Sequence, residues 1–286
     1  MSSDTRPTRS TSPELDPRFV FDFRPADDPG AGQRFSTWLG VEPLSRGPEP
    51  RPDWVVTSQA AVDTELGVLK TGKEADVFLV ERAVPGDPDQ RVVMAAKRYR
   101  GEEHRSFHRS TAYTEGRRTR NTRDARALAK KSAHGRAVAA GQWAGAEWES
   151  LKRFWLAGDP VPYPVQVDGT EILMELVTHD GEVAPRLAQT RPRGDLLASY
   201  FEQLREAMAA LARHGVAHGD LSPYNVLAAG ERLVIIDLPQ AVDIVANPTG
   251  MDFLMRDCHN VCRWFVARGL DVDEHDLFAE LLACAL

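Results

Sequence analysis

Cysteine is scarce in this sequence, and the few that occur lack the spacing of a metal site. Only three are present in 286 residues, Cys258, Cys262 and Cys284, all close to the carboxyl end. An odd count without paired spacing argues against both a disulfide-stapled secreted domain and a zinc domain. A reduced compartment is the simpler interpretation, and we expect Cys258 and Cys262 to be core residues of a helix.

Long apolar runs are also missing. No stretch approaches the roughly 18 residues that a membrane-spanning helix needs, and the amino terminus has no apolar core of the kind found in secretory signals. The net charge of −7 argues against a protein that coats nucleic acid over its whole surface. The sequence therefore predicts a cytoplasmic protein with no membrane partner.

Three stretches of different composition follow one another along the chain. Residues 1–50 are rich in Ser, Thr, Pro, Arg and Asp, so we expect a disordered tail there. Residues 51–177 have the pattern of a small β-rich lobe, interrupted by a basic, flexible insertion at about 98–140. Residues 178–286 have a mostly helical pattern. The sequence therefore predicts an α+β fold of two lobes.

The strongest chemical signal is the loop from His218 to Asn225, which is followed by the apolar run 233–236 and then Asp237. In kinases a catalytic aspartate and an asparagine five residues later share one loop, and a second aspartate follows a short strand to hold Mg²⁺. Asp220, Asn225 and Asp237 reproduce that spacing. Ordinary turns also favour Asp and Asn, but the complete set, with the strand in register, favours phosphoryl-transfer chemistry.

Lys97 ends an apolar strand, where a lysine can neutralise nucleotide phosphates if a glutamate on a facing helix holds it. Ala95, two residues earlier, is small enough for an adenine ring to lie against the strand. On the helix predicted at about 143–156, Glu147 is the preferred partner, because Glu149 would lie on a different face. The plainer alternative is a surface lysine that closes an edge strand.

A turn with a single glycine, residues 70–75 (KTGKEA), precedes the lysine strand. Backbone N–H groups in such a turn can face anionic oxygens. Gly72 permits the turn, and the Thr71 hydroxyl and the Lys73 ammonium are candidate phosphate contacts. The GxxxxGK[ST] spacing of a Walker loop is absent. Taken alone, the segment is only a turn between strands, but its position before the lysine strand is where a kinase places a phosphate-covering turn.

Together these motifs resemble the RIO kinases, an atypical protein-kinase family. The family's marks are an STGKEA turn, an H(A/G)DLSxxN catalytic loop and an IDxxQ metal loop, which correspond here to residues 70–75, 218–225 and 236–240. The resemblance covers residues 60–268, with Lys70 in place of the family's leading serine. It implies a two-lobed protein-kinase-like fold with a small β-rich N-lobe and a shortened, mostly helical C-lobe.

The resemblance also implies ATP and Mg²⁺ as cofactors, with Mn²⁺ as an alternative metal. Lys97 would anchor ATP, Asp220 would be the catalytic aspartate, and Asn225 and Asp237 would hold the metal. The adenine pocket and hinge implied by the family comprise Ala95, Met174, Glu175 and Val177, and Glu147 would hold the ATP-anchoring lysine.

The predicted activity is transfer of the γ-phosphate of Mg-ATP to a protein serine or threonine, with autophosphorylation or ATP hydrolysis as its main form. The family also allows Asp237 itself to accept phosphate. One alternative is a small-molecule phosphotransferase similar to aminoglycoside or choline kinases, which share an HGDxxxxN loop. The sequence does not identify the acceptor protein.

A second alternative is a nucleotide-gated assembly factor that binds RNA or a ribosomal particle. It depends on the basic segment 98–136: from Lys97 to Arg136 there are 13 Lys and Arg residues against 4 Asp and Glu residues. Arginine interleaved with aromatic residues suits single-stranded RNA. A loop that folds over ATP is equally consistent with this composition.

Overall fold

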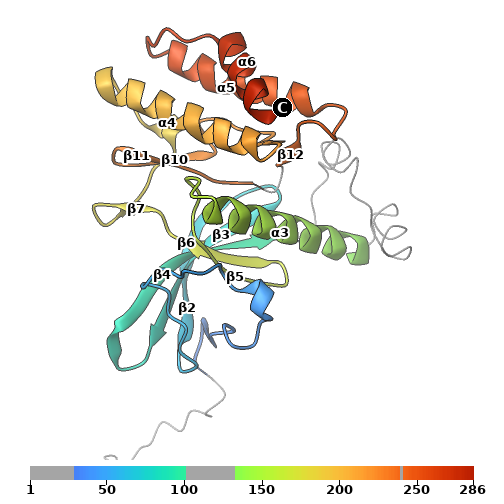
Figure 1. The fold of residues 1–286 in the computed structure, drawn as a ribbon. Helices are drawn as coiled ribbons and strands as arrows, with labels where there is room; N and C mark the ends of the chain where they lie inside the picture. The colour runs from blue at the N-terminus through green and yellow to red at the C-terminus, as the bar shows by residue number, and fades with distance from the viewer. Residues whose placement is uncertain (1–28, 101–132, 239–240) are drawn as a thin grey trace, which may run out of the picture.

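The computed structural model describes residues 29–100, 133–238 and 241–286, which form a sheet lobe and a helical lobe (Figure 1). The sheet lobe is one antiparallel sheet in the order β1-β2-β3-β4-β6-β5. Its strands are β1 (Gln33–Phe35), β2 (Val62–Thr71), β3 (Ala75–Val84), β4 (Asp87–Tyr99), β5 (Pro164–Asp168) and β6 (Glu171–Glu175). Helix α3 (Ala133–Leu156) lies between this sheet and the other lobe.

The second lobe is mostly helical and carries short two-stranded pairings next to the sheet lobe (Figure 1). Its helices are η4 (Leu187–Gln189), α4 (Gly194–Arg213), α5 (Gly250–Val266) and α6 (Glu274–Ala285). Its strands are β7 (Thr178–His179), β8 (Glu182–Val183), β9 (Val216–Ala217), β10 (Val226–Ala229), β11 (Arg232–Ile235) and β12 (Val242–Asp243). This is the arrangement that the sequence predicted, with strands first and helices later.

The second half of β4, from Met94 to Tyr99, has buried side chains on both faces, and these alternate between two cores. Met94 and Ala96 belong to a cluster on the outer face of the sheet that includes Trp38. Ala95 and Tyr99 belong to the main core, together with residues of α3 and the helical lobe. Successive strand residues point to opposite faces, so the residue that follows Ala96, Lys97, is directed toward the space between the lobes.

The outer face of the sheet is covered by the segment before β2, which corrects one prediction. Residues 1–50 were expected to be disordered, but residues 29–50 contain β1 and a short helix, η2 (Pro43–Ser45). Trp38 of this segment is only 3% exposed. Trp38 packs in an apolar cluster with side chains of β3, β4, β5 and β6, and average composition does not reveal such packing. Residues 1–28 lie outside the described part.

The predicted basic insertion at 98–140 lies mostly outside the described residues. β4 continues to Tyr99 and α3 begins at Ala133, so both ends of the predicted insertion belong to regular elements. Residues 101–132, which carry most of its basic side chains, are not among those described.

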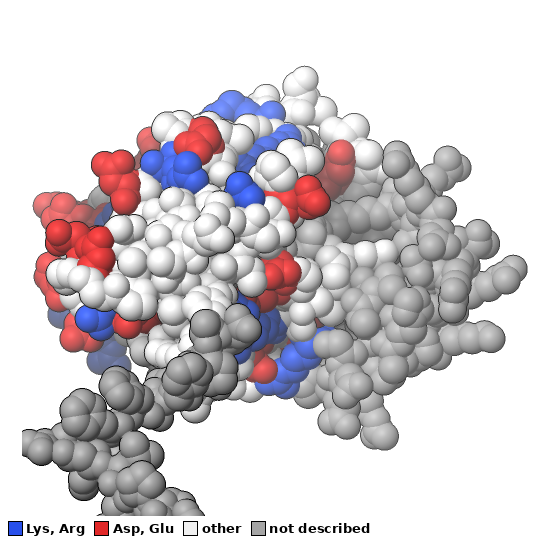
Figure 2. Space-filling view, turned by 90° about the horizontal axis from the view of Figure 1, so that it is seen from below, with Lys and Arg blue, Asp and Glu red and all other residues white. Residues whose placement is uncertain are grey.

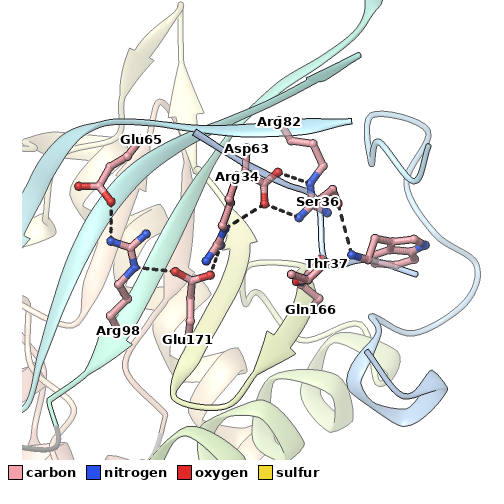
Figure 3. Close-up of polar contacts among 10 residues, drawn as sticks. Arg34, Ser36, Thr37, Asp63, Glu65, Arg82, Arg98, Gln166 and Glu171 are labelled. Atoms are coloured by element: carbon pink, nitrogen blue, oxygen red, sulfur yellow. Dashed lines mark hydrogen bonds and ion pairs between the residues drawn. The ribbon is translucent and has the colours of Figure 1, made fainter. Parts of the chain in front are cut away.

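A buried ion pair holds β2 against β3. The Arg82 guanidinium donates to both carboxylate oxygens of Asp63, at 2.6 and 2.9 Å. The side chains of Arg82 and Asp63 are 0% and 1% exposed. Arg34 of β1 approaches the same carboxylate at 3.6 Å, so the amino-terminal segment takes part in the pair (Figure 3). A buried bidentate pair of this kind is costly to break from one side.

The same network continues across the outer face of the sheet (Figure 3). Glu171 of β6 accepts from Arg34 and, at 2.5 Å, from Arg98 of β4. Arg98 also donates to Glu65 of β2, at 2.6 Å. Opposite charges therefore alternate from β2 to β6, and the strand that carries Lys97 is fixed from its outer side.

Charges of both signs are mixed on the face of the molecule shown in Figure 2. Acidic and basic side chains surround an uncharged central area, and among the described residues visible there no continuous basic surface forms. Within the described ranges, no helix has the length and apolarity that a membrane crossing requires.

Candidate active site

The catalytic and metal loops that the sequence predicted lie side by side. Asp220 and Asn225 lie on the loop between β9 and β10, and Asp237 follows β11. Ile236 joins the two loops: its N–H donates to the Asn225 carbonyl at 3.0 Å, and its carbonyl lies 3.1 Å from Nε2 of His218. Two hydrogen bonds to one residue therefore place Asp237 beside the loop that carries Asp220.

Helix α5 supports the catalytic loop through Asp257, which the sequence analysis did not identify. Its carboxylate accepts from the N–H groups of Gly219 and Leu221, both at 2.8 Å, on either side of Asp220. Asn260, one turn later, donates to the Leu221 carbonyl at 3.1 Å. The available signal was a charged residue on the buried face of an otherwise apolar helical pattern.

Burial raises the pKa of Asp257 to about 6, although its hydrogen bonds and nearby positive charges oppose the increase. Between pH 4 and 6 the folded protein therefore holds this proton more tightly than the unfolded chain does. The free energy of unfolding contributed by Asp257 should fall as pH rises through that window.

We expect the stability advantage of the native protein over Asp257→Asn to shrink by about 2 kcal/mol between pH 4.5 and 7. Urea unfolding of both proteins at the two pH values measures this change. The matched control is Asp252→Asn, an exposed aspartate of the same helix. A native-to-variant difference that stays constant across this pH range would contradict the assignment.

Lys97 is held between two carboxylates. Its ammonium lies 2.7 Å from Glu147 of α3 and 2.7 Å from Asp237. Desolvation would lower the pKa of Lys97, but the two negative charges outweigh it and raise the pKa. Tyr99 donates its hydroxyl to the second oxygen of Glu147. The structure therefore pairs Lys97 with Glu147, whereas Glu149 is 71% exposed and pairs with Lys152.

Asp237 has an unusual backbone conformation, with φ at +68°. Its side chain is 45% exposed and faces Lys97 at the mouth of the space between the lobes. Desolvation would raise the pKa of Asp237, but the adjacent Lys97 charge and hydrogen bond lower it overall. The carboxylate is therefore ionised at neutral pH. Pro239 and Gln240, the rest of the predicted metal loop, lie outside the described residues.

The single-glycine turn joins β2 to β3. The Gly72 N–H donates to the Ala75 carbonyl at 3.0 Å, and a Cβ on Gly72 would lie 2.7 Å from that oxygen, so only glycine fits. Thr71 is the last residue of β2 and is directly paired with Asp76 of β3. Lys73 is exposed at the tip.

The predicted adenine residues meet across β4 and β6. Ala95 is directly paired with Met174, and both are buried in the main core. Val177 differs: its side chain packs with Ala184 and Val234 in a separate cluster. Among these residues, Ala95 and Met174 supply the apolar surface against which a purine could lie.

Glu175, the first predicted hinge residue, is held by the segment before β5. Its backbone N–H donates to the Tyr163 carbonyl at 2.9 Å, and its carboxylate accepts from the Tyr163 N–H at 3.0 Å. These two contacts fix the strand end that leads into the second lobe.

The donor set suits a magnesium ion that is bound together with phosphates. The Asn225 amide donates to the Asp220 carbonyl at 3.0 Å, which directs its side-chain oxygen away from that bond. Among the described residues, no cluster of three or more His, Cys, Asp or Glu could hold a metal without other ligands. Mg²⁺ is commonly held by one or two protein oxygens plus phosphates and water, so Asn225 and Asp237 fit that role.

Comparison with known proteins gives a consistent result. The RIO domain family model matches residues 86–277. The chain is 36% identical to the RIO-type serine/threonine-protein kinase Rio1 of Haloferax volcanii, over 76% of this chain and 68% of the relative. Rio1 of Methanocaldococcus jannaschii is 30% identical, over 74% and 67%. Human RIO3 is 32% identical, but over only 48% of this chain and 27% of the relative.

Among solved structures, the Rio2 kinase of Chaetomium thermophilum in an ADP/Mg²⁺-phosphoaspartate complex has a similar fold. The TM-score is 0.50 at 24% identity, and the match covers 77% of this chain and 65% of that one. The two-lobed kinase-like fold expected from the sequence is thereby confirmed. The family match covers the predicted catalytic and metal loops, and the chain therefore belongs to the RIO kinase family.

Proposed function

We propose that the chain binds Mg-ATP between its lobes and transfers the γ-phosphoryl group to a serine or threonine hydroxyl of a protein, its own chain included. The observation that carries the proposal is the position of Lys97. It is held between Glu147 and Asp237, next to the loop that bears Asp220. A buried lysine so placed can neutralise nucleotide phosphates without moving.

The proposed step breaks the bond between the γ-phosphorus and the oxygen that leaves with ADP. A new bond forms between that phosphorus and the acceptor oxygen, and the hydroxyl proton passes to the Asp220 carboxylate. Asn225 and Asp237 would hold Mg²⁺, which supplies charge neutralisation across the phosphates when bound. Mn²⁺ should replace it, because carboxylate and carbonyl oxygens suit both ions.

The other candidate functions have less support. The relatives described above are named serine/threonine kinases, which does not favour a small-molecule phosphotransferase. An RNA or ribosomal partner would depend on the basic segment 98–136, and residues 101–132 of it lie outside the described part.

Incubation with Mg²⁺ and ATP labelled at the γ-phosphate tests the proposal. We expect label in protein or as released phosphate from the native chain, and none from Asp237→Asn. Stability of the label to acid but not to base would indicate a phosphorylated hydroxyl residue, whereas lability under both conditions would indicate an aspartyl phosphate. A native chain that does not bind ATP would refute the proposal.

Loss of Glu147 should weaken use of ATP much more than loss of Glu149. In Glu147→Ala, Lys97 keeps its ion pair with Asp237 but loses the one that holds it to α3. Because its ammonium can then move away from the phosphate position, we expect kcat/KM for ATP to fall roughly tenfold or more. In Glu149→Ala the pair that is removed has a carboxylate that is 71% exposed, and such a solvent-screened pair is worth about 0–1 kcal/mol. Steady-state kinetics of both variants measure the contrast. Equal effects would contradict the pairing.

A further inference from the structure

The catalytic loop contains no basic residue between Asp220 and Asn225. Charge that develops on a transferred phosphoryl group still has to be neutralised. We propose that Lys70 and Arg186 do this: they contact the γ-phosphoryl group of the bound nucleotide, on the side away from Lys97. This inference rests on the proposed function and assigns two contacts within that site.

Lys70 lies in the same cross-strand row as Lys97. Lys70 is paired with Val77 across β2 and β3, and Val77 is paired with Lys97 across β3 and β4. Residues directly opposite each other in a sheet point to the same face. Lys97 faces the space between the lobes, as its contacts with Glu147 and Asp237 show. Lys70 therefore faces the same space, two strand spacings or about 10 Å away along the sheet.

Arg186 approaches the site from the helical lobe. It forms an isolated antiparallel bridge with Leu227. The carbonyl of Pro185, just before it, accepts from the Ala228 N–H at 2.9 Å. The N–H of Ala188, two residues after it, donates to the Pro223 carbonyl at 2.9 Å. These bonds tie its backbone to both sides of Asn225, the predicted metal ligand. Arg186 is thus anchored beside the catalytic loop, although it comes from a separate segment of the chain.

Lys70 and Arg186 both lie within reach of the negative charge of Asp237. Desolvation lowers the pKa of both Lys70 and Arg186, and the negative charge of Asp237 acts in the opposite direction on both. The Arg186 charge further lowers the pKa of Lys70. The two cations therefore repel each other. Within the described ranges, the nearby carboxylates Glu147 and Asp237 form ion pairs with Lys97, and no ion pair includes Lys70 or Arg186.

An anion between Lys70 and Arg186 would relieve this repulsion. The site is bounded by Lys97, which neutralises phosphates from the sheet side, and by Asp237, whose predicted role is to hold Mg²⁺. The terminal phosphate of a nucleoside triphosphate is the anionic group that both the geometry and the proposed chemistry would place there. A nucleoside diphosphate has no group at that position.

The test compares the affinity of Mg²⁺-bound ADP with that of a β,γ-imido analogue of ATP, which is not hydrolysed. We expect Lys70→Ala and Arg186→Ala each to weaken binding of the triphosphate analogue about tenfold and to leave ADP affinity unchanged. Arg193→Ala, at an exposed position before α4, is the matched control and should retain the native ratio of triphosphate affinity to ADP affinity. Lys70→Arg and Arg186→Lys keep the positive charge and should retain most of the preference for the triphosphate analogue over ADP. This result would distinguish a lost phosphate contact from misfolding.

The outcomes distinguish this inference from the function on which it rests. If the native chain binds triphosphate and transfers label, but both alanine variants keep the native ratio of the two affinities, the inference alone is wrong. Equal weakening of ADP and triphosphate binding would also overturn it, because the residues would then contact the α- or β-phosphate. If the native chain binds neither nucleotide, the proposed function fails and the inference fails with it.

Discussion

Replacement of Asp220 by asparagine is expected to lower the rate of phosphoryl transfer by about 10²- to 10⁴-fold, with little change in ATP affinity. Asparagine is nearly the same size and can keep the loop in place, but it cannot take the proton of the acceptor hydroxyl. Single-turnover transfer of labelled phosphate, measured together with equilibrium binding of ATP, separates the two effects.

A control for Asp220→Asn is Asp271→Asn, which removes an exposed carboxylate just before α6. It should retain native transfer and native binding. A rate for Asp220→Asn within threefold or so of native would mean that Asp220 does not act as a base or orienting group. Parallel loss of ATP binding would instead indicate that the loop had collapsed.

Removal of the Asp63 carboxylate is expected to cost about 3–5 kcal/mol of unfolding free energy. In Asp63→Ala the Arg82 guanidinium, which is fully buried in the native protein, would lose both of its hydrogen bonds to that carboxylate. For a chain of this size the loss corresponds to a fall in melting temperature on the order of 10 °C. Thermal and urea unfolding both measure it.

Glu65→Ala provides the comparison on the same strand. Glu65 also pairs with an arginine, but its side chain is 40% exposed and that of its partner Arg98 is 31% exposed. Partly exposed pairs are worth about 0–1 kcal/mol, so melting should change little. If the two variants lost equal stability, the distinction between the buried and exposed parts of the network would be wrong.

Features that are local in the sequence could be predicted from it. The apolar run before Asp237 was predicted to be a strand, and it forms β11. A short apolar run that follows a polar turn is typical of a buried strand. Glu147 could be preferred over Glu149 because residues two apart on a helix cannot face the same lysine. The resemblance to RIO kinases followed from three short segments, residues 70–75, 218–225 and 236–240, whose spacing is local in the sequence.

Features that depend on distant contacts could not be predicted. Trp38 is buried because β3 and β4 present an apolar outer face, which nothing in residues 1–50 indicates. Asp257 accepts hydrogen bonds from Gly219 and Leu221, which are distant from it in the sequence. Its role therefore depends on how α5 packs against the catalytic loop. Thr71 was predicted to lie in the turn, but it is the last residue of β2, and its pairing with Asp76 depends on the register of the hairpin.

Because the segment before β2 packs on the outer face of the sheet, the start of the family match and the start of the described structure are different positions. The family match begins at residue 86, whereas the described structure already begins at residue 29, before β1. A shortened protein that starts at the family boundary would lack all of β1, β2 and β3. A shortened protein that starts at residue 51 would lose β1 and keep the other five strands, but it would expose the apolar cluster in which Trp38 is buried. The smallest part of this chain that can be purified as a stable protein should therefore begin no later than residue 29.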